Sequence, residues 1–258
     1  MKVKDPRGYS TNLYYSDRFG SPDAEARANS APFDLAGQIS YAFVTQVVNA
    51  LNHTSYAQFD YYTGKVVDFE DQNGTVTSDH YSDALDRPTQ VIIGANRGDP
   101  YRSRTLFTYS DSMKKITTNS DLSSYQDGQI TTDLTYDGLG RTIETRKYVG
   151  TGWIVTSKVT FDGMGRVKLS YNPYGTTNDS IYGWSETSYD ALSRVVSVTG
   201  YNGSGVSTGT VQSSYSGNQT TVTDQAGKVR RSTTDALGRL VAVTINSAPP
   251  ATGVQRGN

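Results

Sequence analysis

The chain of 258 residues contains no cysteine and only two histidines, His53 and His80. Without cysteine there is no disulfide, no thiolate metal ligand and no cysteine nucleophile. Two histidines are too few for a His-rich metal site, and neither accompanies a nucleophile-elbow string of the kind that serine hydrolases carry. Charged residues make up only 19%, and 24 Lys and Arg against 25 Asp and Glu leave a net charge of −1. A basic stripe for nucleic acid is therefore not expected.

Long apolar runs are also missing. No stretch approaches the roughly 20 consecutive apolar residues that a membrane-spanning helix needs, so no membrane insertion is expected. Residues 1–7 lack the apolar segment of a secretory signal, so we expect no signal peptide in this chain.

The residues that are abundant favour strands and turns. The chain has 25 Gly and 19 Tyr, together with 7 Phe and 2 Trp, and many Thr and Val. Tyrosine, threonine and valine suit a pleated surface, while good helix formers are few. This composition predicts an all-β chain.

A six-residue string recurs along the sequence. The four best copies are YDGLGR at 136–141, FDGMGR at 161–166, YDALSR at 189–194 and TDALGR at 234–239. Looser copies lie at 59–65, 70–75, 82–87, 109–114 and 223–228. The spacing between copies varies, which indicates a strand–turn–strand unit with connections of different length.

Each copy is typical of a β-hairpin turn. Before the copy at 161–166, Val159 and Phe161 alternate with polar residues, and a similar alternation follows it. The aspartate is expected to accept backbone N–H groups, and the later glycine to take a positive φ. The central Leu or Met is expected to fold over the hairpin as an apolar plug, and the arginine to pair with its own aspartate or with a neighbouring turn. The predicted structural turn residues are Tyr136, Asp137, Gly140, Arg141, Phe161, Asp162, Gly165, Arg166, Tyr189, Asp190, Arg194, Asp235, Gly238 and Arg239.

These strings resemble the YD repeats of the RHS family, which includes bacterial RHS toxins, the C components of insecticidal toxin complexes and the teneurin ectodomain. The resemblance covers most of the chain. It implies tandem antiparallel β-hairpins that form a continuous twisted sheet, here part of a spiral shell. It also implies a role as a scaffold that walls off or displays another polypeptide, such as an enclosed toxin domain.

The chain departs from the family in length and in one motif. Family shells contain many more repeats, so this chain is expected to form an open, curved wall. An Asp-Pro-x-Gly-Leu string of the kind that closes the family's core region is not found, so the family's self-cleavage site cannot be placed in this sequence. We therefore expect the chain to be a segment of a larger RHS-type protein that is secreted or at the cell surface.

The chain is expected to divide into three parts. Residues 1–55 form an irregular N-terminal segment with strands that is continuous with the array, residues 56–246 form the repeat array of β-hairpins, and residues 247–258 form a flexible tail.

Catalysis is not expected, because an aspartate that recurs at every turn is better explained by structure than by a two-carboxylate mechanism. No cofactor and no metal are expected either. The alternative function is a carbohydrate-binding adhesion module that uses Trp153 and Trp184, since aromatic faces stack on sugar rings. The competing interpretation is that these aromatics fill cross-strand pairs within the sheet.

Overall fold

The computed structural model describes residues 1–15, 42–60 and 63–246. The described residues form nineteen strands and two short 3-10 turns, η2 (Asp99–Tyr101) and η3 (Asp111–Met113). The chain divides into two compact units, Met1–Asp133 and Leu134–Asn258. The predicted tail, 247–258, lies outside the described residues, and the expected division at residues 55 and 56 stays a prediction.

The first unit holds nine strands and the start of a tenth. They are β1 (Lys2–Lys4), β2 (Ser10–Tyr14), β3 (Gln46–Val48), β4 (Thr54–Phe59), β5 (Val66–Glu70), β6 (Val76–His80), β7 (Gln90–Ile93), β8 (Ser103–Ser110), β9 (Lys115–Ser120) and β10 (Ile130–Tyr136). A small core of Val76, Ile92 and Ala95 lies within this unit, with Tyr125 packed against it.

The second unit continues the same pattern. Its strands are β11 (Thr142–Tyr148), β12 (Trp153–Phe161), β13 (Val167–Tyr171), β14 (Gly183–Tyr189), β15 (Val195–Asn202), β16 (Ser207–Ser216), β17 (Gln219–Thr223), β18 (Val229–Thr234) and β19 (Leu240–Asn246). Among the described residues of this unit, Val155 is the one hydrophobic side chain that is buried. The stability of this unit therefore depends on the hydrogen bonds between strands and on contacts between neighbouring hairpins.

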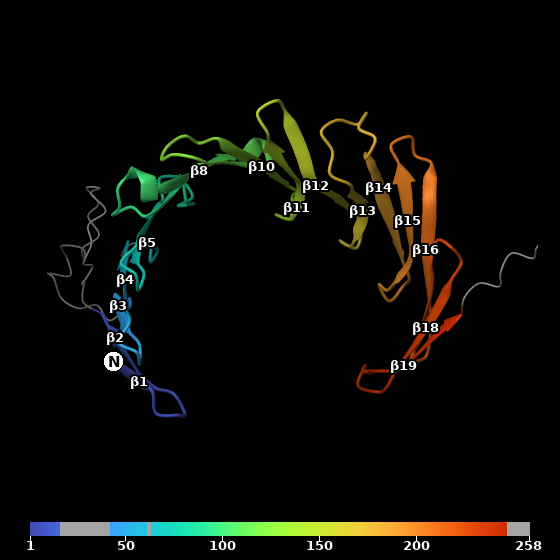
Figure 1. Ribbon diagram of the computed structural model, residues 1–258, viewed down its shortest axis with the longest axis horizontal. Coiled ribbons are helices and arrows are strands. Elements are labelled where there is room, and N and C mark those ends of the chain that lie inside the picture. The colour runs from blue at the N-terminus through green and yellow to red at the C-terminus, as the bar shows by residue number, and fades with distance from the viewer. Residues whose placement is uncertain (16–41, 61–62, 247–258) are drawn as a thin grey trace, which may run out of the picture. The chain divides into compact units, whose positions relative to one another are not determined.

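Within each unit, strands that follow one another in the sequence pair in an antiparallel way (Figure 1). All nineteen strands belong to one sheet. The all-β class and the array of antiparallel hairpins are therefore confirmed. No helix among the described residues is long and apolar enough to cross a membrane.

The turns of the four best sequence copies lie at one edge of the second unit. Because adjacent strands are antiparallel, the turns at 137–141, 162–166, 190–194 and 235–239 all join an even-numbered strand to the following odd-numbered one. We call this edge the YD edge. In three of these hairpins the register shifts by one residue directly before the turn, at Phe161, Tyr189 and Thr234. The extra residue of each bulge lies on the strand after the turn, at Lys168, Val196 and Val241, which have no partner in the register.

Candidate functional site

The turn at 137–141 is held together by the side chain of its first residue. Asp137 Oδ1 accepts the backbone N–H groups of Leu139 at 2.9 Å and Arg141 at 3.0 Å. The Asp137 N–H donates to the Arg141 carbonyl, and the Gly140 N–H donates to the Asp137 carbonyl. Gly140 has a φ of 77°, a left-handed conformation that glycine adopts at little cost. One carboxylate oxygen thus accepts two N–H groups of the turn that no backbone carbonyl accepts.

The same arrangement recurs at the other three best copies, where Asp162, Asp190 and Asp235 each accept two backbone N–H groups of their own turn. Gly165 and Gly238 repeat the positive φ of Gly140. The structure therefore places the predicted turn residues of all four copies in equivalent turns at the YD edge.

Further copies of this turn lie at positions where the repeat string is weak or absent. Asp5, Asp71 and Asp224 each accept two backbone N–H groups in the same way. Asn49 and Asn202 do so with their amide oxygen. An asparagine oxygen accepts the same N–H groups as a carboxylate, so these two turns are copies although the repeat string, defined by its aspartate, does not include them.

The arginine that closes each turn forms an ion pair with the aspartate that opens it. The nitrogen–oxygen distances are 2.6 Å for Arg141 with Asp137, 2.7 Å for Arg166 with Asp162 and 2.6 Å for Arg194 with Asp190. Arginine also reaches the neighbouring turn: Arg141 donates to the Gly165 carbonyl at 3.3 Å. Both predicted arrangements of the arginine therefore occur together.

Each of these guanidinium groups also lies over the aromatic ring of the following hairpin. The distance from Arg Cζ to the ring centroid is 3.9 Å for Arg141 and Phe161, 4.4 Å for Arg166 and Tyr189, and 4.3 Å for Arg194 and Tyr215. In each case the ring belongs to the strand that pairs with the strand following the arginine. This cation–π contact ties one hairpin to the next.

The tyrosine hydroxyl makes a second link between hairpins. Tyr189 donates to the Val167 carbonyl and Tyr215 to the Val195 carbonyl, both at 2.8 Å. The accepting residue directly follows the arginine of the preceding turn. Phe161 occupies the equivalent position but has no hydroxyl. We call the combination of ring, arginine and, where present, hydroxyl the Arg–aromatic link.

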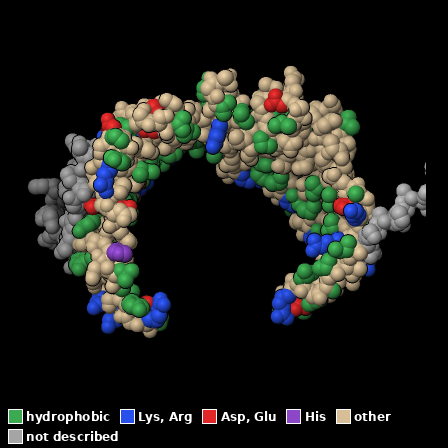
Figure 2. All heavy atoms as spheres, viewed as in Figure 1, with side chains coloured by type: hydrophobic (Ala, Val, Ile, Leu, Met, Phe, Trp, Pro, Cys, Tyr) green, Lys and Arg blue, Asp and Glu red, His purple; other side chains and the backbone are tan. Residues whose placement is uncertain are grey.

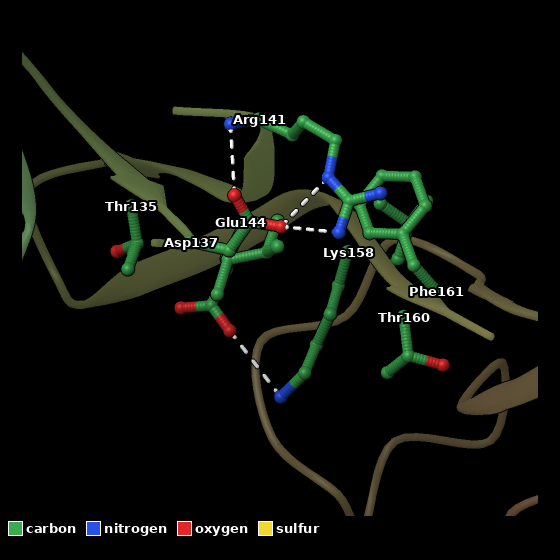
Figure 3. Close-up of a pocket in the computed structure, with 9 residues that line it drawn as sticks. Thr135, Asp137, Arg141, Glu144, Lys158, Thr160 and Phe161 are labelled. Atoms are coloured by element: carbon green, nitrogen blue, oxygen red, sulfur yellow. Dashed lines mark hydrogen bonds and ion pairs between the residues drawn. The ribbon is translucent and has the colours of Figure 1, made fainter. Parts of the chain in front are cut away.

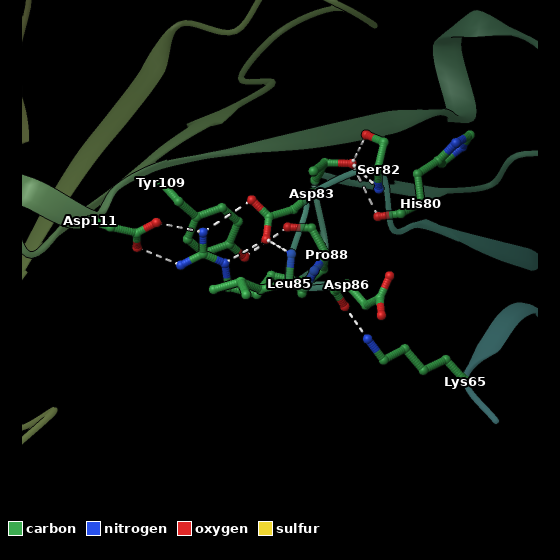
Figure 4. A network of polar contacts seen from close by, with 11 residues as sticks. Lys65, His80, Ser82, Asp83, Leu85, Asp86, Pro88, Tyr109 and Asp111 are labelled. Carbon is green, nitrogen blue, oxygen red and sulfur yellow. Dashed lines mark hydrogen bonds and ion pairs between the residues drawn. The ribbon is translucent and has the colours of Figure 1, made fainter. Parts of the chain in front are cut away.

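The first unit contains the same link with an added carboxylate (Figure 4). Arg87 lies 4.0 Å from the ring centroid of Tyr109, whose hydroxyl donates to the Pro88 carbonyl at 2.7 Å. The guanidinium pairs with Asp83 of its own turn at 2.8 Å and with Asp111 of the next turn at 2.6 Å. Arg87 thus joins two successive turns directly.

These contacts keep the turn carboxylates ionised. The hydrogen bond from the Arg87 side chain, followed by the Leu85 N–H, lowers the pKa of Asp83 to about 2. The side chains of Arg141 and Arg166 lower the pKa of Asp137 and Asp162, and backbone N–H groups contribute further. Each carboxylate is therefore a permanent acceptor inside its own turn.

One prediction about the turns is wrong. The central Leu and Met residues were expected to cover the hairpin, yet they point into solvent. They are Leu85, Leu139, Met164, Leu192 and Leu237, each more than two thirds exposed. The turn is so short that the residue two positions after the aspartate lies at its tip, beyond the sheet surface that it would have to cover.

A shallow cavity of about 450 Å³ lies beside the first turn of the second unit (Figure 3). Asp137 and Arg141 line one side, and the Glu144–Lys158 ion pair, at 3.3 Å, lines another. Phe161, which lies under Arg141, completes the wall. The charged groups of this cavity are thus paired with one another.

The two tryptophans lie in separate groups of aromatic side chains. Trp184 is directly opposite Tyr171 and Tyr201 on the neighbouring strands, at ring-centroid distances of 6.0 and 5.6 Å. Trp153 packs edge-on against Tyr148 at 5.6 Å, and Arg146 lies over its ring. Both tryptophans are half-buried. Cross-strand pairing is thus observed for both, and Trp184 has the larger aromatic surroundings.

No group of three or more His, Asp or Glu side chains in the described part of the chain is placed to hold a metal ion. The predictions that the chain needs no metal, uses no cofactor and performs no catalysis remain predictions.

Sequence reasoning found the turns but missed the Arg–aromatic link. A signal for it exists, because each linked ring is the last or the last but one residue of a strand one hairpin later. Connections of variable length hide this relationship until the strand pairing is known.

Comparison with known proteins gives similarity in structure but not in sequence. No protein family model and no curated protein sequence matches the chain. The crystal structure of TcdB2-TccC3-Cdc42 matches 95% of the chain with a TM-score of 0.66 at 12% identity. That of TcdB2-TccC3-TEV matches 90% with a TM-score of 0.61 at 11% identity. TcdB2-TccC3 without its hypervariable C-terminal region matches 92% with a TM-score of 0.60 at 12% identity.

The chain spans 16% to 18% of the length of these matched chains. At such low identity the match shows a shared fold. The chain therefore has the fold of part of the TcdB2-TccC3 toxin structures. This agrees with the sequence resemblance, which includes proteins of toxin complexes.

Proposed function

We propose that the chain is a non-catalytic scaffold segment of a larger RHS-type protein, which walls off or displays another polypeptide. The observation that carries this proposal is the Arg–aromatic link. It repeats at Arg87, Arg141, Arg166 and Arg194 and ties successive hairpins to one another. A wall that excludes other molecules needs such contacts between neighbours, and it needs no reacting group.

The chemistry of the YD edge supports a structural role for its carboxylates. The oxygens of Asp137 and Asp162 accept N–H groups of their own turn and pair with its arginine. A general acid needs a pKa near the working pH, whereas these pKa values are lowered. The same carboxylates are poorly suited to proton transfer and well suited to fixing a turn.

The first experiment asks in which polypeptide the chain occurs. An antibody against residues 134–246 is applied to cells that produce the protein, to their surface fraction and to their medium. A band far above 28.1 kDa in the medium or surface fraction is expected. Limited proteolysis of that larger polypeptide should leave a second, protected polypeptide. A 28.1 kDa band confined to the cell interior would contradict the proposal.

A second candidate function is carbohydrate binding, and the row of Tyr171, Trp184 and Tyr201 favours it. The three rings lie side by side on one face of the sheet and are half-exposed. Trp153 is a weaker candidate because Arg146 lies over its ring. A glycan array tests this function: binding that is lost in Trp184→Ala and retained in Trp153→Ala would support it, and an array without signal would remove it.

A further inference from the structure

The last hairpin of the described chain carries an arginine without a ring. Arg239 pairs with Asp235 at 2.7 Å, as its counterparts do with their own aspartates. Among the described residues no aromatic side chain lies under its guanidinium. The exposed fraction of the Arg239 side chain is 74%, against 34% for Arg141 and 25% for Arg166, which each cover a ring.

The rest of the second unit shows that the arginine and the ring occur together. The turn between β16 and β17, at Gly217 and Asn218, contains no arginine. At the position where the next hairpin would supply the ring, the chain has Thr234, whose hydroxyl donates to the Asn218 carbonyl. An aromatic residue is thus absent where its arginine is absent. Arg239 is the exception, because its turn has the arginine but no described hairpin supplies the ring.

The strand that follows Arg239 is the last described strand of the second unit. Among the described strands of this unit, β19 pairs with β18 alone. Four apolar side chains on β19 are exposed, namely Leu240, Val241, Val243 and Ile245. Figure 2 shows hydrophobic and basic side chains together at this end of the chain. An unpaired strand edge offers backbone N–H and carbonyl groups to an incoming strand.

The internal links define what the incoming strand must carry. In each of them the ring belongs to a strand that runs antiparallel to the strand after the arginine. The ring is the last or the last but one residue of its strand, and a tyrosine hydroxyl reaches the carbonyl of the residue after the arginine. At β19 that carbonyl belongs to Leu240. Residues 247–258 contain no aromatic residue, so they cannot supply the ring.

We propose that β19 is a strand-addition site for an antiparallel β-strand that ends in a tyrosine followed by an acidic turn. The tyrosine ring would lie under Arg239, and its hydroxyl would donate to the Leu240 carbonyl. This proposal rests on the proposed scaffold function and names the partner that continues the wall. The partner is a hairpin of another segment of the larger protein. A second copy of this chain would present β1, which has no aromatic residue before its turn.

A peptide with the sequence of residues 183–190 is the probe, because its Tyr189 makes this link with Arg166 inside the chain. The labelled peptide is titrated with the full chain, and binding is followed by fluorescence anisotropy. Hydrogen exchange of the β19 amides locates the site. Arg239→Ala in the chain and Tyr189→Ala in the peptide should each weaken binding about tenfold, because a cation–π contact and a hydrogen bond are lost.

The matched control is Arg7→Ala, which removes another exposed arginine that pairs with its own turn aspartate. This variant should bind the peptide like the unchanged chain, and a peptide with Tyr189→Phe should bind several-fold more weakly because it lacks the hydroxyl. Binding that is absent, that ignores Arg239→Ala or that protects amides elsewhere would overturn the proposal. So would dimers of the chain that bury β19. If the antibody experiment succeeds and the peptide fails, the scaffold function stands and only the strand-addition site is rejected.

Discussion

The hydroxyl that joins one hairpin to the next can be removed at one position and added at another. Tyr189→Phe deletes the hydrogen bond to the Val167 carbonyl and leaves the ring under Arg166. Phe161→Tyr adds a hydroxyl to a ring that already lies 3.9 Å from Arg141 Cζ. By analogy with Tyr189, this hydroxyl should reach the carbonyl of Thr142, the residue after the arginine.

The expected size follows from the type of bond. A single intramolecular hydrogen bond contributes about 0.5–1.5 kcal/mol, and Tyr189 is half-buried, so we expect a change of about 1 kcal/mol. Tyr189→Phe should lower the free energy of unfolding by this amount, and Phe161→Tyr should raise it. In a chain of this size the melting temperature should move by about 2–4 °C in each direction.

Urea unfolding followed by tryptophan fluorescence is the appropriate assay, because both tryptophans lie in the same unit as the two substitutions. Tyr101→Phe is the control, since Tyr101 is exposed and lies in the other unit. If Tyr189→Phe unfolds at the same urea concentration as the unchanged chain, the hydroxyl does not join the hairpins and the reasoning is refuted.

Three further predictions concern the turns and one close backbone contact. Because folding lowers the pKa of Asp162, the ionised carboxylate stabilises the folded chain fully above the unfolded-state pKa near 4, and this contribution is lost as the pH falls further. Asp162→Asn should therefore reduce the loss of folding stability at acid pH in a stability-versus-pH curve. Gly183→Ala would place a Cβ 2.4 Å from the Tyr201 carbonyl oxygen and should cost about 1–3 kcal/mol in chemical denaturation, whereas Gly163→Ala, with no atom within 4 Å, should be nearly neutral. Leu139→Ser should change the melting temperature by less than about 1 °C, because the side chain is exposed. A large drop would show that Leu139 packs against the hairpin after all.

The sequence predicted the fold well where the chemistry is local. An aspartate followed by a glycine three residues later defines a turn within five residues, so the residues alone indicate the turn at Asp137 and Gly140. Asn202 forms the same turn through an amide oxygen, and a search restricted to acidic residues did not identify it as a copy. Hairpins and their antiparallel pairing followed from the turns.

The sequence predicted less where the contact depends on which strands are neighbours. Arg141 and Phe161 are separated by a whole strand and a connection, and this separation differs in the other linked pairs. Leu139 was misplaced for a different reason. Its apolar character suggested burial, but the short turn leaves no surface beneath it. Trp153 and Trp184 were considered together, although the structure puts them into separate aromatic groups.

The Arg–aromatic link also bears on how such proteins change over evolutionary time. Each link involves only adjacent hairpins, so the energy of the array is close to a sum over nearest neighbours. Duplication or deletion of one complete hairpin therefore recreates the same junction on both sides and leaves distant hairpins undisturbed. Genes that encode such arrays can lengthen or shorten their product by recombination, with little selection on the remaining sequence beyond the aromatic residue, the aspartate and the arginine.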